Sequence, residues 1–237
     1  MCYRGDPFHR LFRESGCGVP AGEVEAGAVL GRVVWKCLFV YSDADFDMRK
    51  PLFFLADSWY TVNEVSGVQF KPFVFDKMNR QVPVSIEPML PSDAEATNLP
   101  PVWQTSWTSD FLAEERFEKY AAKVNGKLIA LAAYEVLQNS LVVHIVYMEA
   151  HPESNPTLDD GQPEYTGIGR LLIAYGIKLS IDNGFAGDVV LEAKTTSLAK
   201  HYEKDFGAVR LPVFGSSAPR YLIADEAAKR IFFTYLV

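Results

Sequence analysis

A short stretch rich in glycine is the part of the sequence best suited to binding an anion. It reads Tyr165-Thr166-Gly167-Ile168-Gly169-Arg170 and precedes a helical pattern from Leu171 to Asp182. Glycine lets backbone N–H groups crowd around an anion, and the start of a helix adds the positive end of its dipole. The stretch therefore predicts a cradle for a pyrophosphate group, with a simple tight turn as the alternative.

The composition is that of a globular protein, with 49% apolar and 22% charged residues among 237. Lys and Arg total 23 against 30 for Asp and Glu, which gives a net charge of -7. A chain of this charge is poorly suited to binding a phosphate backbone, so we expect no nucleic-acid partner.

The cysteines and the hydropathy pattern indicate the cellular setting. Cys2, Cys17 and Cys37 lack C-x-x-C spacing and nearby paired histidines, so we expect neither a metal site nor a disulfide scaffold. No apolar run approaches the roughly 18 residues of a membrane span, and no signal-peptide core follows Met1. We therefore expect no membrane partner and a reducing, cytoplasmic location.

The first 80 residues are expected to form a β-rich N-terminal region, separated from a second domain at residues 81–237. Runs of β-branched and aromatic residues predict strands at Val29 to Tyr41, Pro51 to Leu55, Trp59 to Val65 and Val68 to Phe75. The polar stretch at residues 76–80 marks the boundary. The role of this region is open.

The second domain begins with a strand pattern, a helix start and a set of aromatic residues. Val82 to Met89 alternates like a strand, and Pro91 to Glu95 carries a helix-capping signal. Trp103, Trp107 and Phe111 recur at four-residue spacing, which predicts one buried helical face, and Ser109 is a candidate cap for a further helix.

The middle of this domain predicts a run of strands. Asn125-Gly126 is a strong hairpin signal between Tyr120 to Val124 and Lys127 to Val136. Another strand, Leu141 to Ala150, is followed by a long polar loop, His151 to Glu164.

The C-terminal part predicts alternating strands and helices. After a helix stop at Asn183-Gly184, Val189 to Ala193 reads as a buried strand, and Ser197 can cap a helix from Leu198 to Asp205. The segment Ala227 to Leu236 fits either helix or strand.

Four segments in this order resemble the GCN5-related N-acetyltransferase superfamily, from about residue 82 to 237. The first, Ile86-Glu87-Pro88-Met89-Leu90-Pro91-Ser92-Asp93-Ala94, is similar to the family's r-p-x-x-x-x-D-a segment, and the second is the hairpin Asn125-Gly126-Lys127-Leu128-Ile129-Ala130. The third, Glu164-Tyr165-Thr166-Gly167-Ile168-Gly169, matches the glycines of the acyl-CoA loop [QR]-x-x-G-x-[GA]. The fourth is the strand Val189 to Leu191 and the turn Thr195-Thr196-Ser197, followed by the helix His201-Tyr202-Glu203-Lys204-Asp205-Phe206-Gly207-Ala208.

The resemblance implies an α+β (mixed α/β) fold with acetyl-CoA as co-substrate. It predicts a central mixed sheet, flanked by helices, whose fourth and fifth strands splay so that acyl-CoA can pair along the fourth strand like an added strand. The residues that it assigns to the cofactor are Met148, Glu149 and Ala150 for the pantetheine arm and acyl group, Tyr165, Thr166, Gly167, Ile168, Gly169 and Arg170 for the pyrophosphate, and Thr195 where the family often has Asn.

The chain departs from the family pattern in the acyl-CoA loop. Glu164 stands where Gln or Arg is preferred, which places an acid near a diphosphate. The preceding loop, which starts at His151, is longer than is common, and one extra residue lies between Tyr202 and Gly207.

Transfer of an acyl group to an amine needs a base for the ammonium proton and an acid for the departing thiolate. Tyr202 is the candidate acid, because the resemblance implies that its hydroxyl points at the CoA sulfur. His144 is one candidate base, since its ordinary pKa is near 6.5. Glu149 is the other, although it lies on the opposite strand face unless a bulge intervenes. Deprotonation through water is the third possibility.

These features predict an N-acetyltransferase that transfers an acetyl group from acetyl-CoA to a primary amine by direct attack. The acceptor is open: it is a small molecule or a protein amine, and a homodimer is possible. Glu153, Asp159, Asp160 and Glu164 suit a cationic amine, or form a solvated loop. The alternatives are a catalytically degenerate binding module and, less favoured for an acidic chain, aminoacyl-tRNA acetylation.

Overall fold

A computed structural model describes residues 69–155, 162–212 and 218–237. The strands predicted at Val29 to Tyr41, Pro51 to Leu55 and Trp59 to Val65, and the three cysteines, lie outside these residues. The β-rich N-terminal region therefore stays a prediction.

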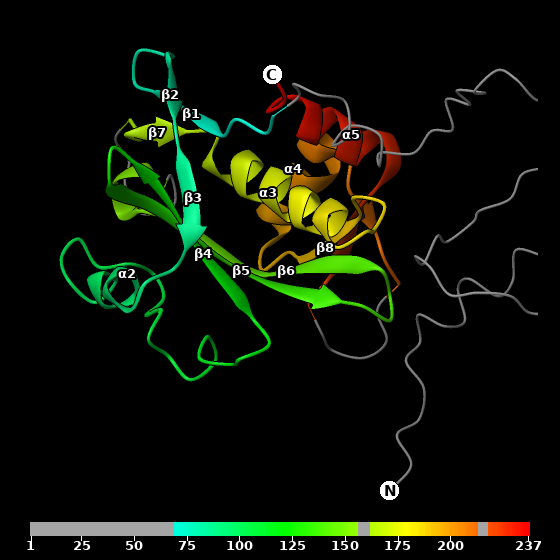
Figure 1. Cartoon of the computed structure of the whole chain (residues 1–237), viewed down its shortest axis with the longest axis horizontal. Helices are drawn as coiled ribbons and strands as arrows, with labels where there is room; N and C mark the ends of the chain where they lie inside the picture. The colour runs from blue at the N-terminus through cyan, green and yellow to red at the C-terminus, as the bar shows by residue number, and fades with distance from the viewer. Residues whose placement is uncertain (1–68, 156–161, 213–217) are drawn as a thin grey trace, which may run out of the picture. The chain divides into compact units, whose positions relative to one another are not determined.

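A seven-stranded mixed sheet forms the centre of the described part (Figure 1). Its strands, in spatial order, are β3 (Ser85–Pro88), β4 (Glu118–Val124), β5 (Lys127–Leu137), β6 (Val142–Ala150), β8 (Val189–Glu192), β10 (Arg220–Ile223) and β9 (Val209–Arg210). The β6–β8 pair is parallel, and the other five pairs are antiparallel. The mixed sheet predicted from the resemblance is confirmed.

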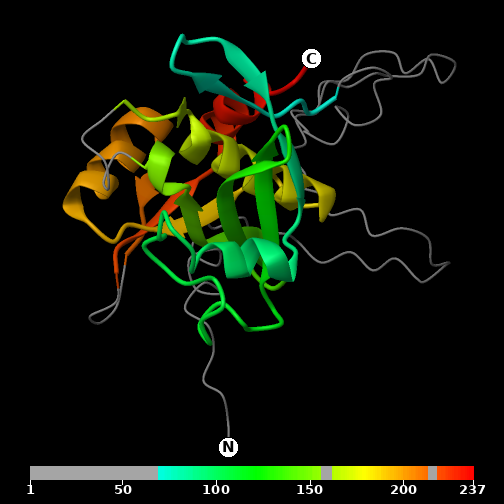
Figure 2. The ribbon, with the colours of Figure 1, turned by 90° about the vertical axis from the view of Figure 1, so that its left-hand side faces the viewer.

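Three helices cover one face of this sheet: α3 (Ile168–Asp182), α4 (Thr196–Phe206) and α5 (Asp225–Phe233). Their side chains join those of the sheet in one buried cluster that includes Tyr134, Ile145, Leu171 and Ile231. Figures 1 and 2 place the short helix α2 (Pro91–Ala96) on the opposite face. There Trp103 and Trp107 help to form a second buried cluster with Leu112 and Leu131.

A small second sheet supports the glycine-rich stretch. It pairs β1 (Phe73–Asp76) with β2 (Gln81–Pro83) on one side and with β7 (Tyr165–Thr166) on the other. Gln69 and Lys71 also exchange backbone hydrogen bonds with the last three residues of the chain. Residues 69–80 therefore fold together with residues 81–237, because β1 finds both of its partner strands there.

The hairpin and the C-terminal helix show how local sequence becomes structure. Asn125 and Gly126 both have positive φ, 49° and 81°, as the tight turn between β4 and β5 requires, which confirms the hairpin prediction. The ambiguous segment after Ala227 forms α5, with Asp225 and Glu226 in its first turn and Arg230 in its last, a distribution that favours a helix.

The helix predicted through Trp103, Trp107 and Phe111 is wrong, as is the one capped by Ser109. Both Trp side chains are buried, but Phe111 is 54% exposed and residues 97–117 form turns and bends. The Trp107 N–H donates to the Thr97 hydroxyl, and the Gln104 N–H donates to Glu149 on β6. These tertiary hydrogen bonds take the place of the helical ones.

Candidate functional site

A bulge in β6 brings the two candidate bases to one face of the sheet. The register with β5 pairs Ile145 with Tyr134 and then Tyr147 with Ala133, which leaves Val146 without a partner residue. Val143, Ile145 and Met148 pack into the cluster beneath α3, whereas Tyr147 packs into the cluster on the opposite side. His144 and Glu149, an odd number of residues apart, therefore both face away from α3.

The parallel strands β6 and β8 separate at this bulge. They pair from Val143 to Ile145 against Val189 to Leu191, and within the described residues no further pair joins them. The splay predicted for the fourth and fifth strands is confirmed. Its consequence is that the β8-facing edge of Val146–Ala150 is left open to another extended chain.

The glycine-rich stretch follows the carboxyl end of β6 and leads into α3. Gly167 is the N-cap of this helix in a left-handed conformation (φ 85°), and the first helical hydrogen bond joins the Leu171 N–H to the Gly167 carbonyl. The amides of Ile168, Gly169 and Arg170 precede this bond and so have no intrahelical acceptor. Apart from its chain neighbours and the backbone of its own helix, a Cβ built at Gly169 meets no atom within 4 Å, so there is room beside this residue.

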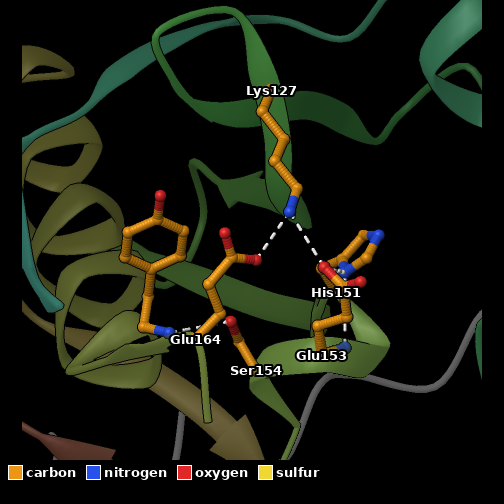
Figure 3. A network of polar contacts seen from close by, with 6 residues as sticks. Lys127, His151, Glu153, Ser154 and Glu164 are labelled. Carbon is orange, nitrogen blue, oxygen red and sulfur yellow. Dashed lines mark hydrogen bonds and ion pairs between the residues drawn. The ribbon is translucent and has the colours of Figure 1, made fainter. Parts of the chain in front are cut away.

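Glu164, the acid that departs from the family pattern, is paired with a lysine. The Lys127 Nζ atom lies 2.6 Å from Glu164 Oε2 and 2.8 Å from Glu153 Oε2, between the two carboxylates (Figure 3). Hydrogen bonds to these acids raise the pKa of Lys127, and the bond to Lys127 lowers the pKa of Glu153. The ammonium compensates the charge of Glu164 where a diphosphate would approach.

The same network closes the base of the long loop. The Glu164 N–H donates to the Glu153 carbonyl at 2.8 Å, and the Tyr165 N–H donates to the Ser154 hydroxyl at 3.0 Å. Tyr165 and Thr166 continue as β7 against β1. The start of the anion cradle is thus fixed from two sides.

Glu149 is buried and its carboxylate is already hydrogen-bonded. Oε1 accepts the Gln104 N–H at 2.5 Å, and Oε2 accepts the Trp107 indole N–H at 3.3 Å. Burial raises the pKa of Glu149, while these hydrogen bonds act in the opposite direction. Its contacts are those of a residue that holds the 97–117 segment against β6.

His144 lies two residues before the bulge at Val146 and is mostly buried. Its Nδ1 atom is 3.6 Å from Glu135 Oε2, and Glu135 also accepts a hydrogen bond from Arg116 at 2.9 Å. Burial lowers the pKa of His144, so the ring is neutral at pH 7. The Nε2 atom is buried and, among the described residues, has no hydrogen-bond partner.

Tyr202 and Thr195 belong to α4, which begins just after the carboxyl end of β8. Burial raises the pKa of Tyr202, so its hydroxyl keeps its proton at neutral pH. Its ring contacts that of Tyr221, with centroids 6.0 Å apart. Thr195 rather than Ser197 caps the helix: its hydroxyl accepts the Leu198 N–H at 3.1 Å.

The splayed parallel pair, the bulge and the helix that starts at a glycine cradle occur together at one end of the sheet. This is the architecture that the sequence resemblance implies. The described part of the chain has the fold expected of a GCN5-related N-acetyltransferase.

Comparison with known proteins gives matches among solved structures. The Escherichia coli ribosomal-protein-S18-alanine N-acetyltransferase is 18% identical, with 60% of this chain and 95% of that chain covered and a TM-score of 0.42. A Bacillus subtilis acetyltransferase in complex with CoA is 16% identical, with 60% and 98% covered and a TM-score of 0.42.

An aminoglycoside acetyltransferase, AAC(6')-Ib in complex with coenzyme A and kanamycin, is 17% identical, with 62% and 98% covered and a TM-score of 0.44. At these identities the likeness is one of fold alone. No family model matches the sequence, and a search of curated proteins gave no match.

Sequence reasoning missed several residues of this acetyltransferase fold. Lys127, Gln104 and Trp107 act through partners 26 or more positions away along the chain, which no local pattern reveals. Lys194 directly follows the predicted strand Val189 to Ala193, and its Nζ lies 3.6 Å from the centroid of the Tyr147 ring. A cation between this strand and the polar turn was the one sign in the sequence that could have indicated Lys194.

Neither a metal site nor a membrane-spanning helix is found among the described residues. Within residues 69–155, 162–212 and 218–237 no group of three His, Cys, Asp or Glu side chains is arranged to hold a metal ion. Over the same ranges, no helix has the length and apolarity needed to cross a membrane.

Proposed function

We propose that this chain is an acetyl-CoA-dependent N-acetyltransferase that acetylates a primary amine by direct attack. The observation that carries the proposal is the open edge of β6 beside the cradle at the start of α3. An extended pantetheine arm needs an open strand edge to pair with, and a pyrophosphate needs the free amides of the cradle.

In this proposal the cofactor lies along the splay. The backbone of Met148, Glu149 and Ala150 pairs with the pantetheine arm, which brings the thioester to the bulge at Val146. The amides from Thr166 to Arg170 hold the pyrophosphate, and Thr195, at the start of α4, flanks the arm from the β8 side of the splay.

The chemistry then needs two proton transfers. The amine nitrogen attacks the thioester carbonyl carbon and gives up a proton to a base, the C–S bond breaks, and the departing thiolate takes a proton from an acid. Tyr202 is the proposed acid, since its hydroxyl is protonated at neutral pH and its helix starts at the splay.

His144 is the proposed base. It shares a sheet face with the open side of the bulge, its lowered pKa keeps it neutral, and Glu135 near Nδ1 favours the tautomer with the lone pair on Nε2. Glu149 suits this role less well, because both of its oxygens already accept hydrogen bonds. We assign it to positioning the 97–117 segment.

The alternative of a degenerate binding module rested on Glu164 and on the long acidic loop. The pairing of Glu164 with Lys127 counters the first of these two grounds. Retention of acetyl-CoA binding without transfer to any amine would still favour the module.

Two experiments test the proposal. Isothermal titration of the full chain with acetyl-CoA measures cofactor binding, and a panel of amines, assayed by the release of free CoA thiol, measures acetyl transfer. We expect a dissociation constant in the micromolar range and transfer to at least one amine. No binding at high micromolar acetyl-CoA would exclude the cofactor assignment.

A further inference from the structure

A surface cavity lies next to the proposed reacting centre, at the carboxyl end of β8. It has a volume of about 280 Å³ and is lined by Ala193, Lys194, Thr195, Thr196, Ala199, Arg210, Pro219 and Tyr221. The volume is close to the lower end for small-molecule sites. It suits an acceptor with few non-hydrogen atoms.

The lining residues of the cavity contact Tyr202 on one side and the strand after the bulge on the other. Ala199 lies three residues before Tyr202 on α4, and Tyr221 packs against the Tyr202 ring. On the other side, Lys194 reaches from the cavity to the ring of Tyr147, the residue after the bulge. The cavity lining thus reaches Tyr202 through Tyr221 and β6 through Lys194.

The charge of the cavity is positive. Its lining contains two cations, Lys194 and Arg210, and no Asp or Glu. Within the described ranges neither cation forms an ion pair with a carboxylate, whereas the neighbouring Arg220 is paired with Glu192 at 2.8 Å. Lys194 does interact electrostatically with Glu149: burial raises the pKa of that carboxyl, and the Lys194 charge acts to lower it. No carboxylate of the described residues, however, lies within ion-pair distance of either cation.

The carboxylates described nearby already have partners. Glu149 is hydrogen-bonded to the 97–117 segment, Glu135 is paired with Arg116, and Glu203 interacts with the hydroxyl of the lining residue Tyr221. In the loop expected to attract a cationic amine, Glu153 and Glu164 are paired with Lys127, and Asp159 and Asp160 lie outside the described residues. The described carboxylates thus offer a simple cationic amine little attraction.

We infer that the acceptor is a small primary amine that also carries an anionic group, a carboxylate or a phosphate, held by Lys194 and Arg210. This inference rests on the proposed function. The anionic group docks between the two cations, which leaves the amine to reach the thioester beside Val146.

Matched acceptors test this inference on the full chain. Two series of acceptors are assayed with saturating acetyl-CoA. The first contains amino acids, their amides and their decarboxylated amines, and the second contains amino sugars and their phosphate esters. We expect kcat/KM to be at least tenfold higher for the carboxylate or phosphate member of a pair than for its uncharged partner. Which of the two series responds identifies the anion.

Variants of the two cations separate this inference from the proposed function. Lys194→Met and Arg210→Gln should each raise KM for the anionic acceptor roughly three- to tenfold and leave KM for its amide unchanged. Lys200→Met, which removes an exposed α4 lysine outside the cavity, is the matched control and should change neither.

Acetyl-CoA binding is measured for every variant. If acetyl-CoA binds and amines without an anion are preferred, or no amine is acetylated, the acceptor inference is overturned while the cofactor assignment stands. If acetyl-CoA itself does not bind, the proposed function fails, and the inference with it.

Discussion

The Lys127 ammonium lies 2.6 Å from the Glu164 carboxylate, and the two residues are 37 positions apart in the chain. Lys127 begins β5, and Glu164 ends the loop before the anion cradle. The contact compensates a negative charge directly before the amides that face the proposed diphosphate.

Removing this lysine should weaken cofactor binding. In Lys127→Met the unpaired Glu164 repels the diphosphate by about 1 kcal/mol, a roughly fivefold rise in the Kd for acetyl-CoA. Glu164→Gln should restore the affinity of the lysine variant, so the double variant binds about as well as the parent.

The parent, Lys127→Met, Glu164→Gln and the double variant form a double-mutant cycle. Titration calorimetry at low salt gives the Kd of all four proteins for acetyl-CoA. Lys178→Met, which removes an i,i+4 pair with Asp182 in the last turn of α3, is the control and should leave Kd unchanged. Additive effects of the Lys127 and Glu164 changes would rule out the coupling.

Gly169 allows a direct test of the cradle. Gly169→Ala should fold at least as stably as the parent, because the added Cβ meets no protein atom within 4 Å and alanine favours the helix. If the amides enclose a pyrophosphate, that methyl group obstructs it, and the Kd for acetyl-CoA rises about tenfold or more.

Gly167→Ala is the contrasting change. Its φ of 85° is unfavourable for alanine, so thermal unfolding should show a loss of about 1 kcal/mol. Unchanged acetyl-CoA binding in Gly169→Ala would show that no phosphate lies at this amide.

Glu149→Ala should destabilise the fold. The Gln104 amide and the Trp107 indole would lose their buried acceptor, at a cost of about 1–3 kcal/mol in the free energy of unfolding. Urea denaturation measures the loss. The matched change Glu226→Ala, at an exposed pair on α5, should cost less than about 0.5 kcal/mol.

Trp107→Phe should show part of the same loss, since it removes only the indole donor. If Glu149 were instead the base, Glu149→Gln would abolish turnover at unchanged stability, which contradicts the positioning role.

His144 should give the rate a characteristic pH dependence. Because burial lowers its pKa, the acidic limb of kcat lies below the ordinary value of about 6.5. His144→Gln should remove this limb and lower kcat by about two orders of magnitude. His201→Gln, at an exposed histidine paired with Asp205, should retain both the limb and the rate.

The same shift affects stability. A histidine whose pKa is lower in the folded state stabilises the fold above about pH 6.5, and this contribution is lost as the pH falls through the folded-state pKa. The free energy of unfolding of the parent should therefore fall more steeply below pH 6.5 than that of His144→Gln. Parallel curves would contradict this origin.

Tyr202→Phe should lower kcat and leave the Kd for acetyl-CoA unchanged, because only the proton for the thiolate is lost. Tyr175→Phe, which removes the hydroxyl of a half-buried tyrosine on α3, is the control for packing. Presteady-state release of CoA thiol separates chemistry from product release. Equal rates for parent and Tyr202→Phe would exclude Tyr202 as the acid.

Much of the fold follows from local sequence. Asn125-Gly126 specifies its hairpin because both residues tolerate positive φ. The glycines before Leu171 predict the start of α3, because only glycine readily takes the left-handed conformation of this N-cap. Runs of apolar residues likewise located β6 and β8, since a strand buried on both faces is apolar at consecutive positions.

The tertiary structure decided what short-range patterns cannot encode. Trp103 and Trp107 fit a helical period, yet hydrogen bonds to Glu149 and Thr97 hold them in a loop. The bulge at Val146 depends on the register between two strands, and it alone places Glu149 and His144 on one face. Sequence alone indicated the glycine cradle, but the pairing that neutralises Glu164 required Lys127 to arrive from another strand, because electrostatic compensation acts through space rather than along the chain.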